Sequence, residues 1–342
     1  MAIEPSPRHL NATYSDSSSE SDSPDEIAPP WPESDHSDTS SDVTELDQDD
    51  FPNYFEERNG RLFPSHGNPP YPLPVDADEQ QRANLQHALL FRLTGEHYRG
   101  PVQRVLREKR RALDLCTGTG QWVLDMAHEF PNVRWHGIDI VPIATRRPPD
   151  NVYFEMADVN QAFRFQAEYF DFVHARAVSM AVRDYPVLLD EVARVLRPGG
   201  LFLACEWGRC VEMADGRDPR LFVPRTCDFF NAVNQALVSR GITAIAAHIP
   251  TWLQESGHFN HIRRHIFKMP LGASPRDSQE RGEIGTQFKN IMRLYANSMR
   301  VMLIETGWNS SEVEALIRGY LYEMDTVPGI VCLYSTVYAR RI

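Results

Sequence analysis

The sequence predicts an α/β domain with a doubly wound, mostly parallel sheet, preceded by a disordered acidic tail. Three observations predict it. Short apolar segments alternate with amphipathic helical segments between residues 111 and 207, which is typical of βαβ units with helices on both faces of a sheet. A glycine-rich turn follows the first of these apolar segments. The first 50 residues carry the net negative charge of the chain.

Residues 1–72 are predicted to form the disordered tail. They are rich in Ser, Asp, Glu and Pro, so they cannot bury enough apolar surface to offset the entropy lost on ordering. Residues 1–50 contain 14 acidic residues and one arginine and carry −13, whereas the whole chain of 342 residues carries −12. Residues 51–342 therefore carry +1, which excludes a domain-wide basic surface for nucleic acid.

Neither a targeting segment nor a membrane span is expected. The N-terminal residues lack the apolar core of a signal peptide, and no stretch of about 18 consecutive apolar residues occurs. We therefore expect a protein of the cytoplasm or nucleus that is not secreted and does not contact membranes. The five cysteines form no CxxC pair and no Cys/His cluster with zinc spacing, so neither a disulfide framework nor a metal site is expected.

The predicted elements begin with a helix near Asp76, which can cap it. Its inward face is predicted from Leu85, Ala88, Leu89 and Leu93, which recur at helical spacing. The strands predicted for the sheet are residues 111–116, 133–140, 152–156, 170–175 and 201–207. Helices are predicted between them at residues 121–130 and 185–196, the second ending at a Pro-Gly-Gly segment.

Beyond residue 208 the pattern is less regular. Helices are predicted at residues 226–239, 283–304 and 311–324, and strands at 261–269 and 331–339. The last helix is predicted to open with a capping box from Ser311 to Glu314. A stripe of Met and aromatic residues on the last two helices is typical of a core face, and the alternative is a lid over a substrate. The stripe consists of Met292, Tyr295, Met299, Met302, Tyr320 and Met324.

The turn from Asp114 to Gly120 (DLCTGTG) is the most informative motif. It lies between the first strand and the first helix of the sheet, at the carboxyl edge where open α/β sheets bind ligands. Its small residues let the backbone approach a ligand, and the helix N-terminus offers free N–H groups. A dinucleotide fingerprint requires G-x-G-x-x-G/A, but Val123 stands where the third small residue belongs.

Acidic residues follow three successive predicted strands: Asp114, Asp139 and Asp158. In a pocket for S-adenosylmethionine, the first acid would face the ammonium group, directly or through water. The second would accept from both ribose hydroxyls. The third would accept from the adenine amino group while Val159 packs on the ring. The alternative is that each is a turn-forming aspartate at a strand end.

These segments resemble class I S-adenosylmethionine-dependent methyltransferases. The matching segments are residues 113–120 (LDLCTGTG), 137–140 (GIDI), 170–176 (FDFVHAR) and 195–200 (VLRPGG). The segments DEQQRANLQHALL, MPLGASPRDSQERGEIG and STVYARRI resemble, more narrowly, the fungal methyltransferase family that includes regulators of secondary metabolism. The resemblance implies a Rossmann-like class I methyltransferase fold with added helices over residues 73–342. Its cofactor-binding core would span about 100–207, and its substrate-binding, lid and closing elements about 208–342.

The resemblance also implies a site for S-adenosyl-L-methionine. The implied residues are Tyr98, Asp114, Cys116, Thr117, Gly118, Gly120, Asp139, Ile140, Asp158 and Val159. Tyr98 would cover the carboxylate end of the cofactor, and the alternative is a surface aromatic residue. Cys116 stands where the family usually has glycine, and we expect binding to survive with an altered affinity.

No uniform catalytic residue is expected, because methyl transfer from a sulfonium mainly requires that the nucleophile be positioned and desolvated. A general base is needed only if the nucleophile arrives protonated. His174 and Arg176 follow the fourth strand and are the candidates: His174 would take a proton, and Arg176 would hold an acidic group of the substrate. The alternative is a packed histidine and a structural ion pair. Glu206 and Trp207 end the fifth strand, where they would wall the pocket or simply pack.

The predicted function is methyl transfer from S-adenosylmethionine to a nucleophile of a small molecule or a protein. One alternative is a non-catalytic regulator that keeps the methyltransferase fold and acts through protein contacts. Its basis is the acidic tail, Cys116 and the regulators within the family. A nicotinamide-dependent oxidoreductase is a third, weaker alternative, because the third small residue of the fingerprint is missing. The expected partners are a methyl acceptor and regulatory proteins, with neither nucleic acid nor membrane.

Overall fold

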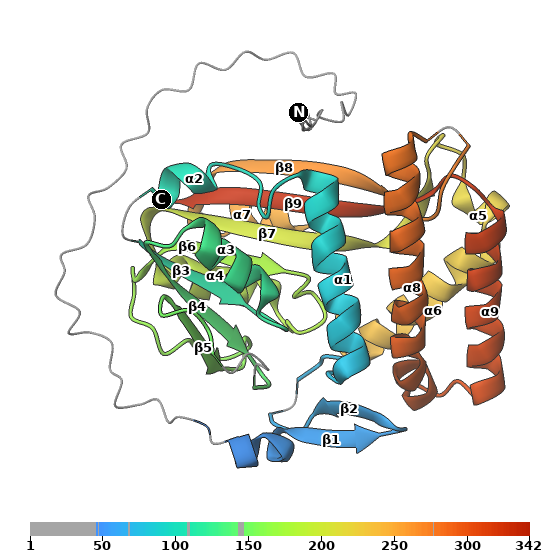
Figure 1. Cartoon of the computed structure of the whole chain (residues 1–342), viewed down its shortest axis with the longest axis horizontal. Helices are drawn as coiled ribbons and strands as arrows, with labels where there is room; N and C mark the ends of the chain where they lie inside the picture. The colour runs from blue at the N-terminus through green and yellow to red at the C-terminus, as the bar shows by residue number, and fades with distance from the viewer. Residues whose placement is uncertain (1–45, 47, 68, 108–109, 143–146, 276) are drawn as a thin grey trace, which may run out of the picture.

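The computed structural model describes residues 46, 48–67, 69–107, 110–142, 147–275 and 277–342, and its centre is a seven-stranded sheet (Figure 1). The strands lie in the order β5-β4-β3-β6-β7-β9-β8. The first five of these are parallel, and β9 runs antiparallel to both β7 and β8. The strands are β3 (Arg110–Leu115), β4 (Val133–Asp139), β5 (Val152–Met156), β6 (Phe170–Arg176), β7 (Leu196–Met213), β8 (Phe259–Pro270) and β9 (Ile330–Arg341). The predicted doubly wound, mostly parallel fold is confirmed.

The strand order reverses between β3 and β6. β4 and β5 extend the sheet on one side of β3, whereas β7 extends it on the other side of β6. Ligands of open α/β sheets bind at the carboxyl edge of such a reversal. The register there pairs Asp114 with Gly137 of β4 and with His174 of β6. Motifs that are far apart in the sequence therefore meet at one edge of the sheet.

Helices cover both faces of the sheet, and each face has its own apolar core. Successive residues of β7 alternate between the two cores, Leu201 and Leu203 in one and Phe202 and Ala204 in the other. The first core includes residues of α1 (Ala77–Thr94), α2 (Val102–Val105), α3 (Gln121–Glu129), α6 (Pro224–Ser239), α8 (Gln279–Glu305) and α9 (Ser310–Thr326). The second includes residues of α4 (Tyr185–Val195) and α7 (Ile249–Glu255). The short α5 (Pro219–Phe222) connects β7 to α6.

An ordered hairpin precedes the helices, so the prediction of disorder up to residue 72 is wrong. A 3-10 helix, η2 (Gln48–Tyr54), leads into β1 (Phe55–Arg58) and β2 (Arg61–Pro64). Residues 1–45 of the predicted tail lie outside the described residues.

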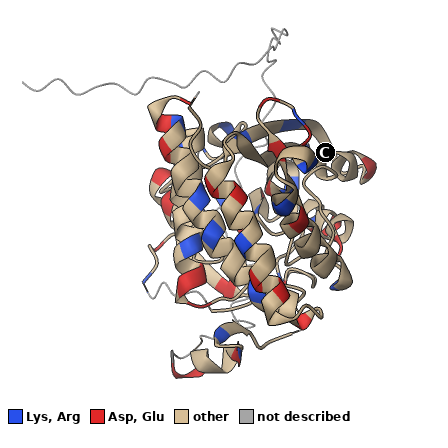
Figure 2. Ribbon diagram, turned by 90° about the vertical axis from the view of Figure 1, so that its right-hand side faces the viewer, with Lys and Arg blue, Asp and Glu red and all other residues tan. Residues whose placement is uncertain are grey.

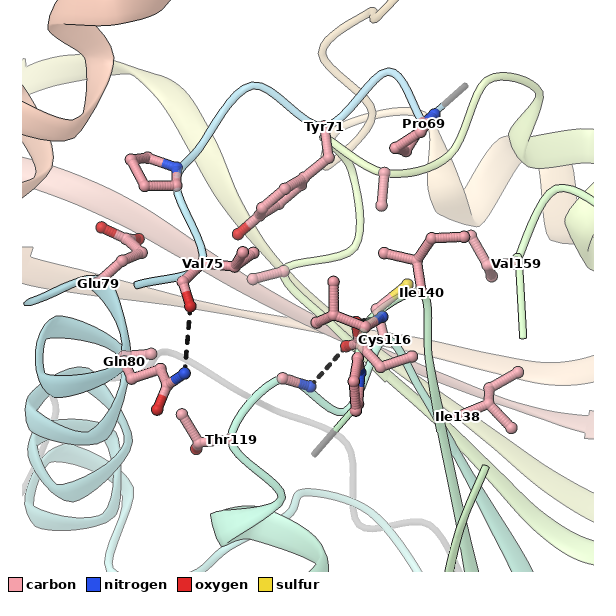
Figure 3. Close-up of a pocket in the computed structure, with 18 of the residues that line it drawn as sticks. Pro69, Tyr71, Val75, Glu79, Gln80, Cys116, Thr119, Ile138, Ile140 and Val159 are labelled. Carbon is pink, nitrogen blue, oxygen red and sulfur yellow. Dashed lines mark hydrogen bonds between the residues drawn. The ribbon is translucent and has the colours of Figure 1, made fainter. Parts of the chain in front are cut away.

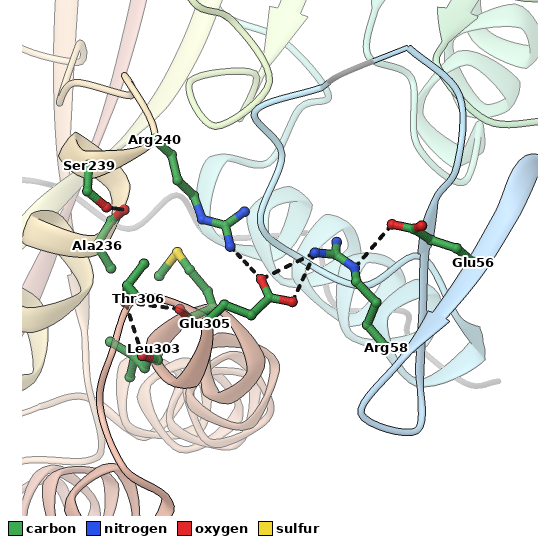
Figure 4. A network of polar contacts seen from close by, with 9 residues as sticks. Glu56, Arg58, Ala236, Ser239, Arg240, Leu303, Glu305 and Thr306 are labelled. Atoms are coloured by element: carbon green, nitrogen blue, oxygen red, sulfur yellow. Dashed lines mark hydrogen bonds and ion pairs between the residues drawn. The ribbon is translucent and has the colours of Figure 1, made fainter.

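Two ion pairs explain why the amino-acid composition did not predict the hairpin. Arg61 donates to both carboxylate oxygens of Asp76 at 2.6 and 2.9 Å, and Asp76 caps α1. Arg58 donates to both carboxylate oxygens of Glu305 at 3.0 and 3.2 Å, and Arg240 of the α6 C-terminus contacts the same carboxylate (Figure 4). The hairpin is thus held by contacts with α1 and α8, which a count of its own apolar residues does not reveal.

The predicted inward face of α1 is confirmed only in part: Leu89 is buried and Leu93 packs against the first core. Leu85 is 45% exposed and Ala88 is exposed. The buried residues of this helix are Glu79, Arg82, His87, Leu89 and Leu90. The inner face of α1 is therefore largely polar, and Glu79 and Arg82 of this face line a pocket.

The capping box of α9 lies two residues before the predicted one. The Asn309 side chain accepts from the Glu312 backbone N–H at 2.9 Å, and the Glu312 carboxylate accepts from the Asn309 N–H at 3.1 Å. Asparagine is as good an N-cap as serine, so the earlier start adds a residue to the helix. The predicted Met and aromatic stripe belongs to the first core through Met292, Met299, Met302, Tyr320 and Met324, and Tyr295 packs against that core.

Acidic and basic residues are interspersed over the helices on the α8–α9 side of the molecule (Figure 2), as expected from the nearly neutral net charge of residues 51–342. Among the described residues, no helix has both the length and the apolar character required to cross a bilayer.

Gly285 and Gly282 of α8 provide a matched test of the packing that places this helix. A Cβ at Gly285 would lie 2.2 Å from the carbonyl oxygen of Gly272, whereas a Cβ at Gly282 would meet that of Ala273 at 3.5 Å, an ordinary contact. Gly285→Ala should lower the free energy of unfolding by about 1–3 kcal/mol through overpacking. Gly282→Ala should leave it unchanged or raise it by up to about 1 kcal/mol. Urea unfolding measures both, and equal stabilities would contradict the close approach.

Candidate functional site

A pocket lies at the carboxyl edge of β3 and β4, and we call it the edge pocket (Figure 3). The turn after β3 and the ends of β4 and β5 form one wall. The opposite wall comes from residues 69–75, which precede α1, and from the first two turns of α1. The pocket therefore occupies the position that the strand reversal predicts for a ligand.

Asp139 ends β4 and lies in the wall of this pocket. One carboxylate oxygen accepts from the Gly118 N–H at 2.8 Å, and the other accepts from the Val141 N–H at 3.3 Å. Burial raises the pKa of Asp139 to about 6. Gly118 has a φ of +59°, and a Cβ placed on it would meet no atom within 4 Å. The turn thus faces open space in which a ligand can approach the backbone.

Asp158 follows β5 and lines the same pocket. One of its oxygens accepts from the backbone N–H and the side-chain amide of Asn160, each at 2.9 Å. The Asn160 amide also donates to the Ala181 carbonyl at 2.9 Å, which ties this loop to the one after β6. Six of the predicted cofactor residues line the edge pocket: Cys116, Gly118, Asp139, Ile140, Asp158 and Val159.

Asp114 does not line the edge pocket. It is 4% exposed, and its carboxylate lies 2.7 Å from Nδ1 of His174. Burial lowers the pKa of His174, so the imidazole is neutral at neutral pH and its Nδ1–H donates to Asp114. Trp122 stacks on the imidazole with ring centroids 3.6 Å apart. The carboxylate predicted to face a cofactor ammonium instead has a buried partner.

Thr117 and Gly120 shape the turn without lining the pocket. The Thr117 N–H donates to the Ile138 carbonyl at 3.0 Å, and the Gly120 N–H donates to the Thr117 carbonyl at 3.1 Å. Cys116 has a φ of +52°, a conformation that glycine adopts without steric cost. This gives a physical reason for the glycine that the resembled family usually has at this position.

Tyr98 lies away from the edge pocket, so its predicted role at the cofactor is not supported. It is 6% exposed, and its hydroxyl donates to Glu129 of α3 at 2.6 Å. The alternative of a surface aromatic is wrong, because the side chain is buried. Its hydroxyl is hydrogen-bonded to a carboxylate at the end of α3, and its ring packs in the first core.

His174 and Arg176 also lie outside the edge pocket. His174 is a packed histidine, as in the structural alternative, whereas the partner of Arg176 is a histidine rather than an acidic residue. Arg176 donates from Nη1 to Nδ1 of His87 at 3.0 Å, and Nε2 of His87 lies 2.7 Å from Asp125. Burial lowers the pKa of His87 to about 4, so its Nδ1 accepts from Arg176 and its Nε2–H donates to Asp125.

His87, His97 and Asp125 lie close enough to hold a metal ion. In this arrangement, however, the nitrogen that a metal would need carries a proton.

The sequence analysis missed the wall formed by residues 69–75 and α1. Tyr71 and Val75 line the edge pocket from this segment, and Glu79, Gln80 and Arg82 line it from α1. Gln80 donates to the Val75 carbonyl at 3.1 Å, which joins the two parts of the wall (Figure 3). The available signal was the apolar stretch PYPLPV at 70–75, which differs from the acidic sequence before it.

Comparison with known proteins gives one family model, two relatives and one solved structure. Residues 80–269 match a family model described as a methyltransferase domain. The chain is 30% identical over 287 residues to the secondary metabolism regulator laeA of Coprinopsis cinerea, covering 79% of this chain and 70% of that protein. It is 30% identical over 273 residues to the methyltransferase pytC of Aspergillus terreus, covering 78% and 81%. Among solved structures, phosphoethanolamine N-methyltransferase 2 of Haemonchus contortus aligns over 82% of this chain and 61% of that chain, with a TM-score of 0.44 and 16% identity.

Substitutions of Asp114 test its structural role. Asp114→Ala leaves the buried Nδ1–H of His174 without an acceptor and should lower the free energy of unfolding by about 1–3 kcal/mol. Asp114→Asn keeps an oxygen that can accept this bond and should cost less. Urea unfolding of the two variants measures the difference. An Asp114→Ala variant as stable as the wild type would show that the hydrogen bond does not hold this edge of the sheet.

Proposed function

The chain belongs to the methyltransferase-domain family, and we propose that it transfers the methyl group of S-adenosylmethionine to a nucleophile held beside the edge pocket. Membership of this family implies S-adenosylmethionine as the cofactor, in agreement with the sequence prediction. The observation that carries the proposal is the convergence of Asp139, Asp158 and the Gly118 turn on one pocket at the strand reversal.

The residues of the edge pocket fit this cofactor. The carboxylates of Asp139 and Asp158 are acceptors for hydroxyl and amino groups, and they lie at the ends of neighbouring strands. Ile140 and Val159 provide apolar surface for the adenine ring, and the turn at Gly118 leaves space for the methionine moiety of the cofactor. We assign Asp139 to the ribose hydroxyls and Asp158 with Val159 to the adenine.

The bound cofactor supplies a methyl group on a sulfonium, which is already an excellent leaving group. The residues of this chain then have to hold the cofactor, exclude water and align the acceptor. Residues 69–75 and α1 contribute to exclusion because they close the pocket from the side opposite the sheet. Cys116 is not assigned a covalent role, because burial raises the pKa of its thiol and keeps it neutral.

A second candidate function is regulation of secondary metabolism through protein contacts. The similarity to the regulator of Coprinopsis cinerea favours it, as does the acidic N-terminal segment. The two functions separate in cells that carry Asp139→Ala in place of the wild type. A metabolite profile that is unchanged by this variant favours scaffolding, whereas a profile equal to that of the deletion strain favours catalysis.

Gly118 and Gly199 form a matched pair for testing the cofactor site. Both have positive φ, +59° and +76°, and a Cβ on either would meet no atom within 4 Å. Alanine at either position therefore brings similar backbone strain. Only Gly118 lines the edge pocket, so Gly118→Ala should weaken S-adenosylhomocysteine binding by about tenfold or more, or at least 1.4 kcal/mol. Gly199→Ala should bind as the wild type does in isothermal titration calorimetry, and equal losses would contradict the assignment.

Cofactor binding should depend on pH through Asp139. Burial raises the pKa of this carboxyl to about 6, and only the ionised form accepts from two hydroxyls without a competing proton. The affinity for S-adenosylhomocysteine should therefore fall as the pH decreases through that value. Asp139→Asn should weaken binding by about 10- to 100-fold at neutral pH and flatten this pH dependence.

The matched control for this experiment is Asp190→Asn, since Asp190 is an exposed carboxylate on α4. It should keep both the affinity and the pH dependence of the wild type. If the Asp139→Asn variant keeps the wild-type pH profile, a group other than Asp139 causes the pH dependence. Absence of S-adenosylhomocysteine binding by the wild type would overturn the proposed function itself.

A further inference from the structure

A second pocket lies beside the edge pocket, and we call it the inner chamber. Tyr71, Arg82 and Ala177 line both pockets, so the two share a wall. Five aromatic side chains line the inner chamber, including Trp207 of β7 and Phe288 of α8. These two rings stack with centroids 5.1 Å apart and an interplanar angle of 12°. The chamber therefore offers flat apolar surface next to the proposed site of the methyl donor.

Two charged side chains of β7 line this apolar space, Glu206 and Arg209. In a regular strand, residues three apart point to opposite faces of the sheet. The pairing of β7 with β9 is interrupted between Trp207 and Val211, and such an irregularity changes the direction of side chains. The local distortion thus places Arg209 in the same chamber as Glu206.

Glu206 is held in a fixed orientation. One carboxylate oxygen accepts from the backbone N–H groups of Val178 and Ser179 at 2.8 and 3.1 Å, and the side chain is almost completely buried. Burial raises the pKa of Glu206 to about 7. At neutral pH the group is therefore able both to take and to release a proton, which is what a general base requires.

Arg209 keeps a positive charge beside the same chamber. Its guanidinium donates to the carbonyl oxygen of Ser179 at 3.1 Å. Burial lowers the pKa of Arg209, because a cation among apolar side chains loses hydration. An oxygen that becomes negative in this chamber would recover part of that lost interaction.

We propose that the inner chamber binds an aromatic methyl acceptor with a ring hydroxyl, and that Glu206 takes the hydroxyl proton during transfer. The inference rests on the proposed function and specifies its acceptor. The hydroxyl oxygen bonds to the methyl carbon while the sulfonium carbon–sulfur bond breaks, and the electron pair of that bond stays on sulfur. The proton moves to the Glu206 carboxylate, so the products are a methyl ether, S-adenosylhomocysteine and a neutral carboxylic acid.

The two charges explain the choice of a hydroxyl. A thioether carries no proton and needs no base, so Glu206 would have no role in its methylation. A protonated amine would be repelled by Arg209. A hydroxyl on an aromatic ring uses both groups, since Glu206 accepts the proton and Arg209 stabilises the oxyanion that forms.

A purely structural role for Glu206 is the competing explanation, because it anchors the loop after β6. Glutamine in its place keeps an oxygen that can accept from Val178 and Ser179 but cannot take a proton. The groups that interact electrostatically with Glu206 come from several elements, and none of them changes in that variant. They are Arg209 and Cys205 of β7, Cys116 of the turn after β3, Tyr185 of α4 and Tyr334 of β9.

The test uses the full chain, labelled S-adenosylmethionine and 2-naphthol as the acceptor probe. The wild type should methylate 2-naphthol at a rate that rises as the pH increases through about 7, the pKa of Glu206. Glu206→Gln should bind S-adenosylhomocysteine as the wild type does, lose about 100-fold or more of the transfer rate and lose this pH dependence. Glu212→Gln is the matched control, because Glu212 lies on the same strand but pairs with Lys268 at the surface.

A second variant tests the chamber independently of the base. Met292 lines the inner chamber but not the edge pocket. Met292→Trp should abolish 2-naphthol binding to the protein loaded with S-adenosylhomocysteine and leave the affinity for S-adenosylhomocysteine unchanged. The inference is overturned if the loaded wild type neither binds nor methylates 2-naphthol, if the label enters only protein, or if Glu206→Gln transfers at the wild-type rate. A wild type that fails to bind S-adenosylhomocysteine rejects the proposed function instead.

Discussion

One buried hydrogen bond, between Asp114 of β3 and His174 of β6, holds the sheet edge on which both pockets depend. The two residues are direct partners in the strand register and lie where the strand order reverses. Leaving either of them unpaired in a buried position would cost about 1–3 kcal/mol, and Trp122 confines the imidazole further by stacking on it. The turn follows directly after Asp114, and the Thr117 N–H donates to the Ile138 carbonyl of β4. The hydrogen bond from Gly118 to Asp139 then connects the turn to β4.

The central sheet could be predicted from the sequence because its signals are local. A parallel strand such as Phe170–Arg176 is buried at every residue but its last, and the glycine turn after β3 has its own pattern. Tertiary effects could not be predicted in the same way. The inner side of α1 carries Glu79 and Arg82 because it lines a pocket, so the leucine pattern was right for Leu89 but wrong for Leu85. Local rules are expected to fail at functional sites.

The site was predicted in part for the same reason. Asp139 and Asp158 follow strand ends, so their meeting at one edge follows from the parallel sheet alone. The partner of Asp114 depended on which strand lies next to β3, which the sequence order does not show. The hairpin depends on ion pairs with residues as distant as Glu305, and residues 69–75 are joined to α1 by the hydrogen bond from Gln80 to Val75. Composition alone cannot reveal such partners.

The shared wall gives the two pockets a physical means of coupling. Arg82 lines both pockets and donates to Glu79 at 2.7 Å, while the other oxygen of Glu79 accepts from Ser298 of α8 at 2.6 Å. A ligand that orders α1 and this buried network in one pocket reduces the entropic cost of ordering them for a ligand in the other pocket.

The proposed chemistry depends more on the location of a side chain than on its residue type. His174 has the side chain most often used as a base, but it is enclosed between Asp114 and Trp122. Glu206 lies one strand further along, where it lines the inner chamber.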